Sequence, residues 1–212
     1  PGGLADLRHA VAALHGAGIG VILDLVFNHT GESDALGTSL SLRGLDSRAY
    51  YRHAADGQLI NDTGTGNTVN CQHAIVQELV LDSLRHFVRE AGVDGFRFDL
   101  APVLGRLDTV FDADAPLLRA IRSDALLGSR ILIAEPWDIG PGGYQLGNFR
   151  PPFLEWNDRY RDDIRSFWRG DVAKLGALAT RLAGSSDVFA KADASESRTV
   201  NFIAAHDGMT LA

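Results

Sequence analysis

The sequence predicts an α/β protein built on a parallel sheet, and within that class part of a (β/α)8 TIM barrel. Short apolar runs rich in β-forming residues alternate with segments whose apolar residues recur at helical spacing. The runs are nearly continuously apolar, which is typical of strands covered on both faces of a parallel sheet. Polar side chains follow the ends of successive runs, as at the C-terminal rim of a barrel. Roughly five strands are predicted and a closed barrel has eight, so residues 1–212 are expected to form a fragment of a larger barrel domain.

A doubly wound open sheet is the alternative fold. Its usual sequence cue is a glycine-rich phosphate loop between a strand and a helix, and the sequence contains no such loop. We therefore favour the barrel.

The first third of the chain predicts a helix, a strand and a long loop. The helix is indicated by apolar residues at helical spacing and by two glycines after them: Leu4, Leu7, Val11 and Leu14, then Gly16 and Gly18. Residues 21–27 form a β-rich apolar run interrupted by Asp24, an acid that would need partners if it is buried. The segment 28–70 is too long for an ordinary connection, so we expect it to be a functional loop after this strand.

The middle of the chain predicts two further helix–strand pairs. An amphipathic helix spans about 75–88 and ends near Gly92, and the strand 93–100 follows it. A second helix over about 117–126 precedes a strand at 131–135.

The last part of the chain predicts two strands separated by helices. A glycine- and proline-rich loop at 136–152 leads to a strand candidate at 153–157, and the last strand covers 200–206. Between these strands we expect two helices and a polar loop, at about 158–169, 171–183 and 185–197.

Composition excludes several classes of partner. The net charge is −7, from 20 basic and 27 acidic residues with no basic block, so nucleic acid is not expected to bind. No apolar run approaches the roughly 20 residues of a membrane span, so no membrane association is expected. Cys71 is the only cysteine, which rules out an internal disulfide and fits a reducing, cytoplasmic location.

The strand that ends at Asp99 carries the clearest candidate for a reactive group. Side chains alternate in a strand, so Arg97 and Asp99 share one face. A neighbouring cation favours the ionised acid, and an ionised carboxylate at a strand end is a candidate nucleophile. A structural ion pair is the simpler interpretation when this strand is considered alone.

Two more acids end other strands. Glu135 follows 131–134 and Asp207 follows 200–206. Paired carboxylates are the working groups of most glycoside hydrolases, and partial burial of Glu135 at an apolar barrel mouth would raise its pKa toward that of a general acid. Trp137 offers a face on which a sugar ring can pack.

Each of these residues also has a structural interpretation. Glu135 could be a strand-end acid that faces water, Asp207 a turn or helix cap, Trp137 a packing residue and His29 a satisfied core histidine. Their coincidence at successive strand ends favours a catalytic site. No tight ligand motif such as His-Glu-x-x-His is present, so we expect neither a catalytic metal nor a cofactor.

Four segments in this order resemble the signature regions of the α-amylase superfamily of glycoside hydrolases: 24–29, 95–99, 133–138 and 201–207. The resemblance implies that the chain holds about strands 3 to 7 of the catalytic (β/α)8 barrel, without strands 1, 2 and 8. It implies that Asp99 is the nucleophile, Glu135 the acid/base and Asp207 the stabiliser of the transition state. It also implies that Arg97 holds the nucleophile and that His29 and His206 bind substrate.

Further segments resemble bacterial glycogen debranching enzymes of the isoamylase type: 65–70, 95–105, 135–138, 155–162 and 206–208. This resemblance covers nearly the whole chain and implies hydrolysis of α-1,6 branch linkages in glycogen or limit dextrin, with retention of configuration. The departures are Pro102, where the family usually has Ser or Thr, and Met209, where it usually has Phe.

Three other functions remain open on the sequence. One is an α-1,4-acting amylase or a glucanotransferase of the same superfamily. Another is a non-catalytic protein that binds glucan or a partner protein, although the presence of all three acids speaks against it. The third is an inactive glucan-binding fragment, since an incomplete barrel cannot preorganise its site.

Overall fold

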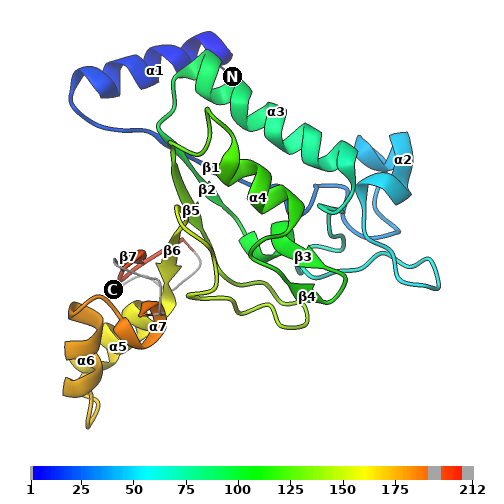
Figure 1. The fold of residues 1–212 in the computed structure, drawn as a ribbon. Helices are drawn as coiled ribbons and strands as arrows, with labels where there is room; N and C mark the ends of the chain where they lie inside the picture. The colour runs from blue at the N-terminus through cyan, green and yellow to red at the C-terminus, as the bar shows by residue number, and fades with distance from the viewer. Residues whose placement is uncertain (1, 191–196, 207–212) are drawn as a thin grey trace.

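The computed structural model describes residues 2–190 and 197–206 and is organised around a five-stranded sheet (Figure 1). Its strands follow one another in chain order: β1 (Ile22–Leu25), β2 (Gly95–Phe98), β5 (Ile131–Ala134), β6 (Leu154–Asn157) and β7 (Thr199–Asn201). All four neighbouring pairs are parallel. The predicted α/β class with a parallel sheet is confirmed, and closure of this sheet into a barrel stays a prediction.

Helices cover one face of the sheet. Figure 1 shows α3 and α4 lying over the central strands, with α1 beside α3, while α5, α6 and α7 gather beside β6 and β7. Their bounds are α1 (Leu4–Gly16), α3 (Ala74–Ala91), α4 (Pro116–Ser123), α5 (Asp158–Arg169), α6 (Leu175–Leu182) and α7 (Ser186–Phe189).

The hydrophobic core lies between this helical layer and the sheet. The apolar stripe of α3 recurs every four residues and is buried, with Leu84 fully covered. It meets strand side chains such as Phe96 and Leu132, which are also fully buried. Gly92 ends α3 at φ 75°, a left-handed conformation that glycine adopts without strain, as the sequence predicts.

The strand register divides the sheet into two faces. Asp24 pairs with Arg97, Arg97 with Ile133 and Ile133 with Leu154, so these side chains form one row on the face opposite the helices. This second face is only partly covered, because Ile22 on β1 and Ile131 on β5 are 40% and 44% exposed.

The predicted loop at 28–70 contains structure that the sequence does not predict. A helix, α2 (Leu42–Tyr50), lies within it and is kinked at Asp46, whose φ and ψ are −160° and 98°. Two isolated antiparallel bridges, Tyr51 with Val69 and His53 with Leu59, fold the rest of the loop back on itself.

A short 3-10 helix η1 (Ala101–Gly105) and a hairpin of β3 (Arg106–Leu107) and β4 (Val110–Phe111) are also unexpected. The last strand ends at Asn201, so its predicted extent to residue 206 is wrong. The loop predicted at 185–197 contains α7, and the helix predicted to residue 126 ends at Ser123. It ends there because the Asp124 carboxylate accepts the amides of Leu126 and Leu127 and forms a turn.

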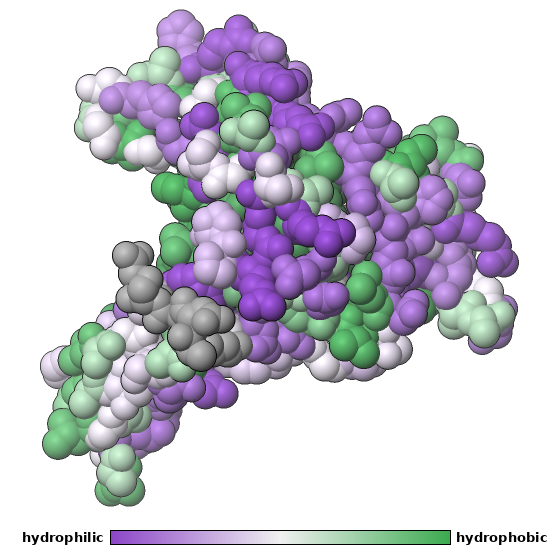
Figure 2. All heavy atoms as spheres, viewed as in Figure 1, coloured by the Kyte–Doolittle hydropathy of each residue, from purple (hydrophilic) through white to green (hydrophobic). Residues whose placement is uncertain are grey.

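Figure 2 shows hydrophobic surface at the far end of the α5–α6 pair, where Val172 and Leu175 are 91% and 70% exposed. Within the described ranges, every helix is too short or too polar to cross a membrane.

Candidate active site

Arg97 on β2 is the centre of a cluster of three carboxylates. Its Nη1 donates to Asp24 Oδ1 at 2.7 Å and to Asp99 Oδ1 at 3.1 Å, and its Nη2 lies 3.0 Å from Glu135 Oε2. The arginine side chain is only 5% exposed. Burial alone would lower the pKa of Arg97, but the hydrogen bond to Asp24 and the charges of the surrounding acids raise it, so the guanidinium remains a cation.

Asp99 is held at both of its carboxylate oxygens. It follows β2 directly, and its backbone N–H donates to Leu25 O at 3.1 Å. Oδ1 accepts from Arg97, and Oδ2 accepts from Asn28 Nδ2 at 2.8 Å. The side chain stays 20% exposed, so an oriented carboxylate reaches the surface at the strand end.

Asn28 is a site residue to which the sequence motifs assign no role. It is fully buried after β1, and its Nδ2 also donates to the Asp99 carbonyl oxygen at 2.8 Å. Its Oδ1 therefore faces His29 Nδ1 at 2.5 Å and requires a proton on that nitrogen. The sequence signals for Asn28 are its position at a strand end and its place in the 24–29 segment, which implies no catalytic or substrate-binding role for it.

The hydrogen bond from Nδ1 to Asn28 Oδ1 orients the ring of His29. Burial lowers the pKa of His29 and outweighs the opposing charge of Asp99, so the neutral ring with Nε2 as an acceptor dominates at neutral pH.

Glu135 occupies the equivalent position at the end of β5. It is 2% exposed, so the predicted burial is confirmed. Its surroundings are more polar than the apolar barrel mouth that we expected, because Oε2 accepts from Leu100 N at 2.8 Å and lies beside Arg97. Leu100 directs this N–H from a left-handed conformation, with φ 41°. These two contacts hold the Glu135 carboxylate in place at the strand end.

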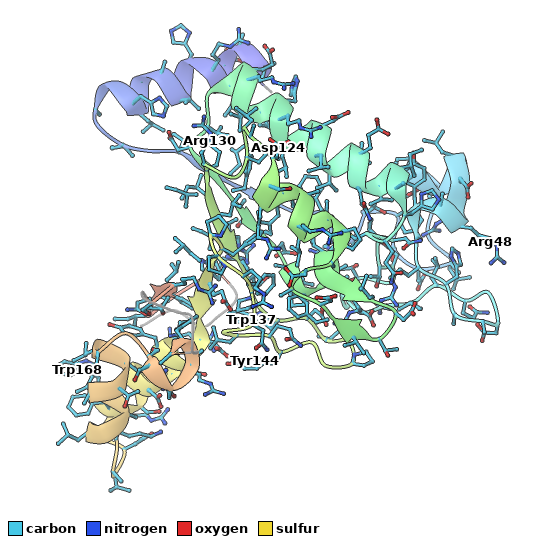
Figure 3. All side chains as sticks on the ribbon, in the orientation of Figure 1. Arg48, Asp124, Arg130, Trp137, Tyr144 and Trp168 are labelled. Carbon is cyan, nitrogen blue, oxygen red and sulfur yellow. The ribbon has the colours of Figure 1, made fainter. Side chains whose placement is uncertain are left out.

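Trp137 lines a cavity of about 270 Å³ near the ends of β6 and β7. The other lining residues are Trp156, Asp158, Arg161, Phe202 and Ala205. Aromatic walls with a few polar groups are typical of a site for a small molecule. In Figure 3, Trp137 lies between the group of α1, α3 and α4 and the group of α5, α6 and α7, whereas Trp168 lies at the outer end of α5.

The loop that carries Trp137 is held by a buried ion pair. Asp138 binds Arg106 through both carboxylate oxygens, and both side chains are fully covered. Burial raises the pKa of Asp138, and Arg106 opposes that shift. Arg52 and Asp62 extend the cluster, with a 2.8 Å ion pair between them.

The 28–70 loop is organised by the carboxylate of Glu32. This side chain is 2% exposed and accepts the backbone N–H groups of Leu40, Ser41 and Arg43 at 2.7 to 3.0 Å, as well as the Tyr51 hydroxyl. Burial raises the pKa of Glu32, but these donors outweigh it and lower the value to about 2.

The structure brings together His29, Arg97, Asp99 and Glu135. His206 lies beside Trp156, with ring centroids 6.1 Å apart, and so belongs to the same region as Trp137. Asp207 lies outside the described residues. Among the residues that are described, no group of three or more His, Cys, Asp or Glu side chains could hold a metal ion.

Comparisons with known proteins show which proteins the chain is similar to. The chain is 54% identical over 208 residues to the glycogen debranching enzyme of Klebsiella pneumoniae, covering 98% of the chain and 32% of that protein. It is 54% identical over 209 residues to the glycogen debranching enzyme of Serratia proteamaculans, covering 98% of the chain and 31% of that protein. The chain thus spans about a third of the length of these curated relatives.

Solved structures give a consistent result. The pullulanase from Anoxybacillus sp. LM18-11, complexed with maltotetraose, matches with a TM-score of 0.75 and 28% identity over 96% of this chain and 30% of that one. The pullulanase from Bacillus acidopullulyticus matches with a TM-score of 0.75 and 26% identity over 96% of this chain and 25% of that one. No protein-family model matches the chain.

Proposed function

We propose that this chain, which belongs to the same family as bacterial glycogen debranching enzymes, forms the catalytic rim of a retaining glycoside hydrolase. Its reaction is hydrolysis of α-1,6 branch linkages in glycogen or limit dextrin. One observation carries the proposal: a single buried guanidinium, that of Arg97, contacts the carboxylates of Asp99 and Glu135 at the ends of adjacent strands.

The roles proposed for the two acids are those that the resemblance to the α-amylase superfamily implies. The Asp99 carboxylate is held at both oxygens, which suits attack on the anomeric carbon. Glu135 protonates the glycosidic oxygen and then activates the water that releases the covalent intermediate. Arg97 reduces the repulsion between the two carboxylates, and Asp207 completes the set of acids as the stabiliser of positive charge.

The fold proposal rests on the second face of the sheet. Ile22, Val26 and Ile131 are 40 to 50% exposed on the face that also carries Arg97. In a closed (β/α)8 barrel this face lies inside, so further strands would cover these side chains. We propose that residues 1–212 form about strands 3 to 7 of that barrel, as part of its catalytic domain.

Substrate is proposed to enter across the cavity beside β6 and β7. Trp137 supplies an aromatic face there, while His29 and His206 supply hydrogen-bonding groups for sugar hydroxyls. The α-glucan partner is supported by the names of the debranching relatives and by the maltotetraose in the Anoxybacillus pullulanase.

Product analysis of the full-length protein that carries this chain tests the proposed function. We expect linear chains to be released from glycogen and linear maltodextrin to remain largely uncut. Cleavage of linear maltodextrin would indicate an α-1,4-acting amylase, and longer linear products would indicate a glucanotransferase. Either result would overturn the linkage assignment.

A variant tests the assignment of the nucleophile. Asp99→Asn keeps the size and hydrogen-bonding shape of the side chain but removes its charge, so turnover should fall at least about 1,000-fold with glucan binding retained. Turnover at the wild-type rate in this variant would refute the role of Asp99.

A further inference from the structure

We infer that Trp156 is a positioning residue that acts through Arg97, an inference that rests on the proposed function. The Arg97 guanidinium carbon lies 4.3 Å from the centroid of the Trp156 ring. A cation over an indole face at this distance is attracted by the ring's π electrons.

The strand register places Trp156 at the level of the two acids. Ala134 pairs with Glu155, so Glu135 and Trp156 occupy the next position on their strands, on the face that carries Arg97. Arg97 lies two residues earlier on its strand than Asp99, and its side chain extends toward the strand end to contact both acids and the indole.

The stack constrains the plane of the guanidinium. Asp24, Asp99 and Glu135 contact its nitrogen atoms, and the indole covers one of its two flat faces. A planar fork that is covered on one face cannot rotate without losing contacts to the carboxylates. Trp156 therefore holds the orientation in which one arginine contacts both proposed catalytic acids.

Neighbouring aromatic residues support the indole itself. The Trp156 ring lies 5.2 Å from the Phe202 ring and 6.1 Å from the His206 ring. Trp156 also lines the cavity that contains Trp137, so a direct role in substrate binding is the competing interpretation. The two roles differ in their kinetic effect, because a substrate contact changes KM whereas misplacement of the acids changes kcat.

The experiment measures kcat and KM for debranching in the full-length protein. Trp156→Leu removes the aromatic face and should lower kcat roughly 10- to 100-fold with little change in KM. Trp156→Phe keeps a smaller aromatic face and should restore most of that loss. Trp168→Leu is the matched control, because Trp168 is 79% exposed at the far end of α5, and this variant should leave both constants unchanged.

A double-mutant cycle tests whether the effect passes through Arg97. Lysine keeps the charge but not the planar fork, so the effects of Arg97→Lys and Trp156→Leu on kcat should be strongly non-additive. Additive effects, or a rise in KM with kcat unchanged, would overturn the inference and assign Trp156 to substrate binding.

A measurement without turnover separates this inference from the proposed function. In protein labelled with 15N-arginine, the ring current of Trp156 should displace the Arg97 Nε–H resonance, which the Arg97→Lys variant identifies. Trp156→Leu should abolish the displacement, and an unchanged resonance would refute the stacking. Wild-type protein that shows the displacement but no debranching would refute only the proposed function.

Discussion

Replacing Glu32 by glutamine should loosen the 28–70 loop by a predictable amount. The carboxylate accepts three backbone N–H groups and the Tyr51 hydroxyl, and its pKa is lowered from the usual 4.5 to about 2. That difference corresponds to about 3 kcal/mol of stabilisation of the folded loop by the charged form. Glu32→Gln retains an acceptor oxygen but loses the charge, so we expect a loss of about 2 to 3 kcal/mol at pH 7.

The pH dependence follows from the direction of this shift. A folded-state pKa below the unfolded value means that the stabilisation is complete above about pH 4.5 and is lost as the pH falls toward 2. The difference between wild type and Glu32→Gln should therefore shrink by roughly 2 kcal/mol at pH 3.

Amide hydrogen exchange in the full-length protein measures this effect locally. The amides of Leu40, Ser41 and Arg43 should exchange on the order of 100-fold faster in Glu32→Gln at pH 7. Glu78→Gln on the exposed side of α3 is the matched control and should leave these amides unchanged. Less than a threefold change in Glu32→Gln at pH 7, or a difference that is undiminished at pH 3, would refute the role of the Glu32 carboxylate.

Three further variants test other parts of the structure. Asn28→Ala removes the donor to Asp99 Oδ2 and should lower kcat roughly 10- to 100-fold with a smaller change in KM, measured by glucan hydrolysis; an unchanged kcat would contradict it. Arg106→Leu leaves the Asp138 carboxylate buried without its cation and should cost about 3 to 5 kcal/mol in urea unfolding, whereas a loss below 1 kcal/mol would exclude a structural role for the pair. Gly170→Ala should cost about 1 kcal/mol by the same assay, because φ is 90° although no atom lies within 4 Å of an added Cβ.

Periodicity predicts most of the regular elements because burial determines them. The stripe of α3 and the apolar strands around Phe96 and Leu132 each bury a continuous face, so hydrophobic spacing alone indicates them. The helix α2 and the hairpin of β3 and β4 escape such prediction. The turn that begins α2 is held by polar contacts, chiefly those of the Glu32 carboxylate. Glu32 lies eight or more residues away in the chain, so the local sequence pattern does not indicate these contacts.

The residues of the candidate site also fall into those that the sequence indicates and those that it does not. Motifs indicate Asp99, Glu135 and Arg97 as functional, since charged groups at the ends of apolar strands are conspicuous. They do not reveal that Asn28 contacts Asp99 or that Trp156 contacts Arg97. Their contacts join strands whose residues lie 71 and 59 positions apart in the chain, and only the register of the sheet brings them together.

The sequence by itself determined the parallel α/β class, the order of the strands and the residue types at their ends, because these depend on local hydrophobic pattern and chain connectivity. Only the tertiary structure decided that one guanidinium would contact three carboxylates and stack on an indole. The physical reason is that hydrogen bonds and cation–π attraction stabilise only groups that lie within a few ångströms of each other. They therefore depend on how the strands align across the sheet, which the order of residues along the chain does not state.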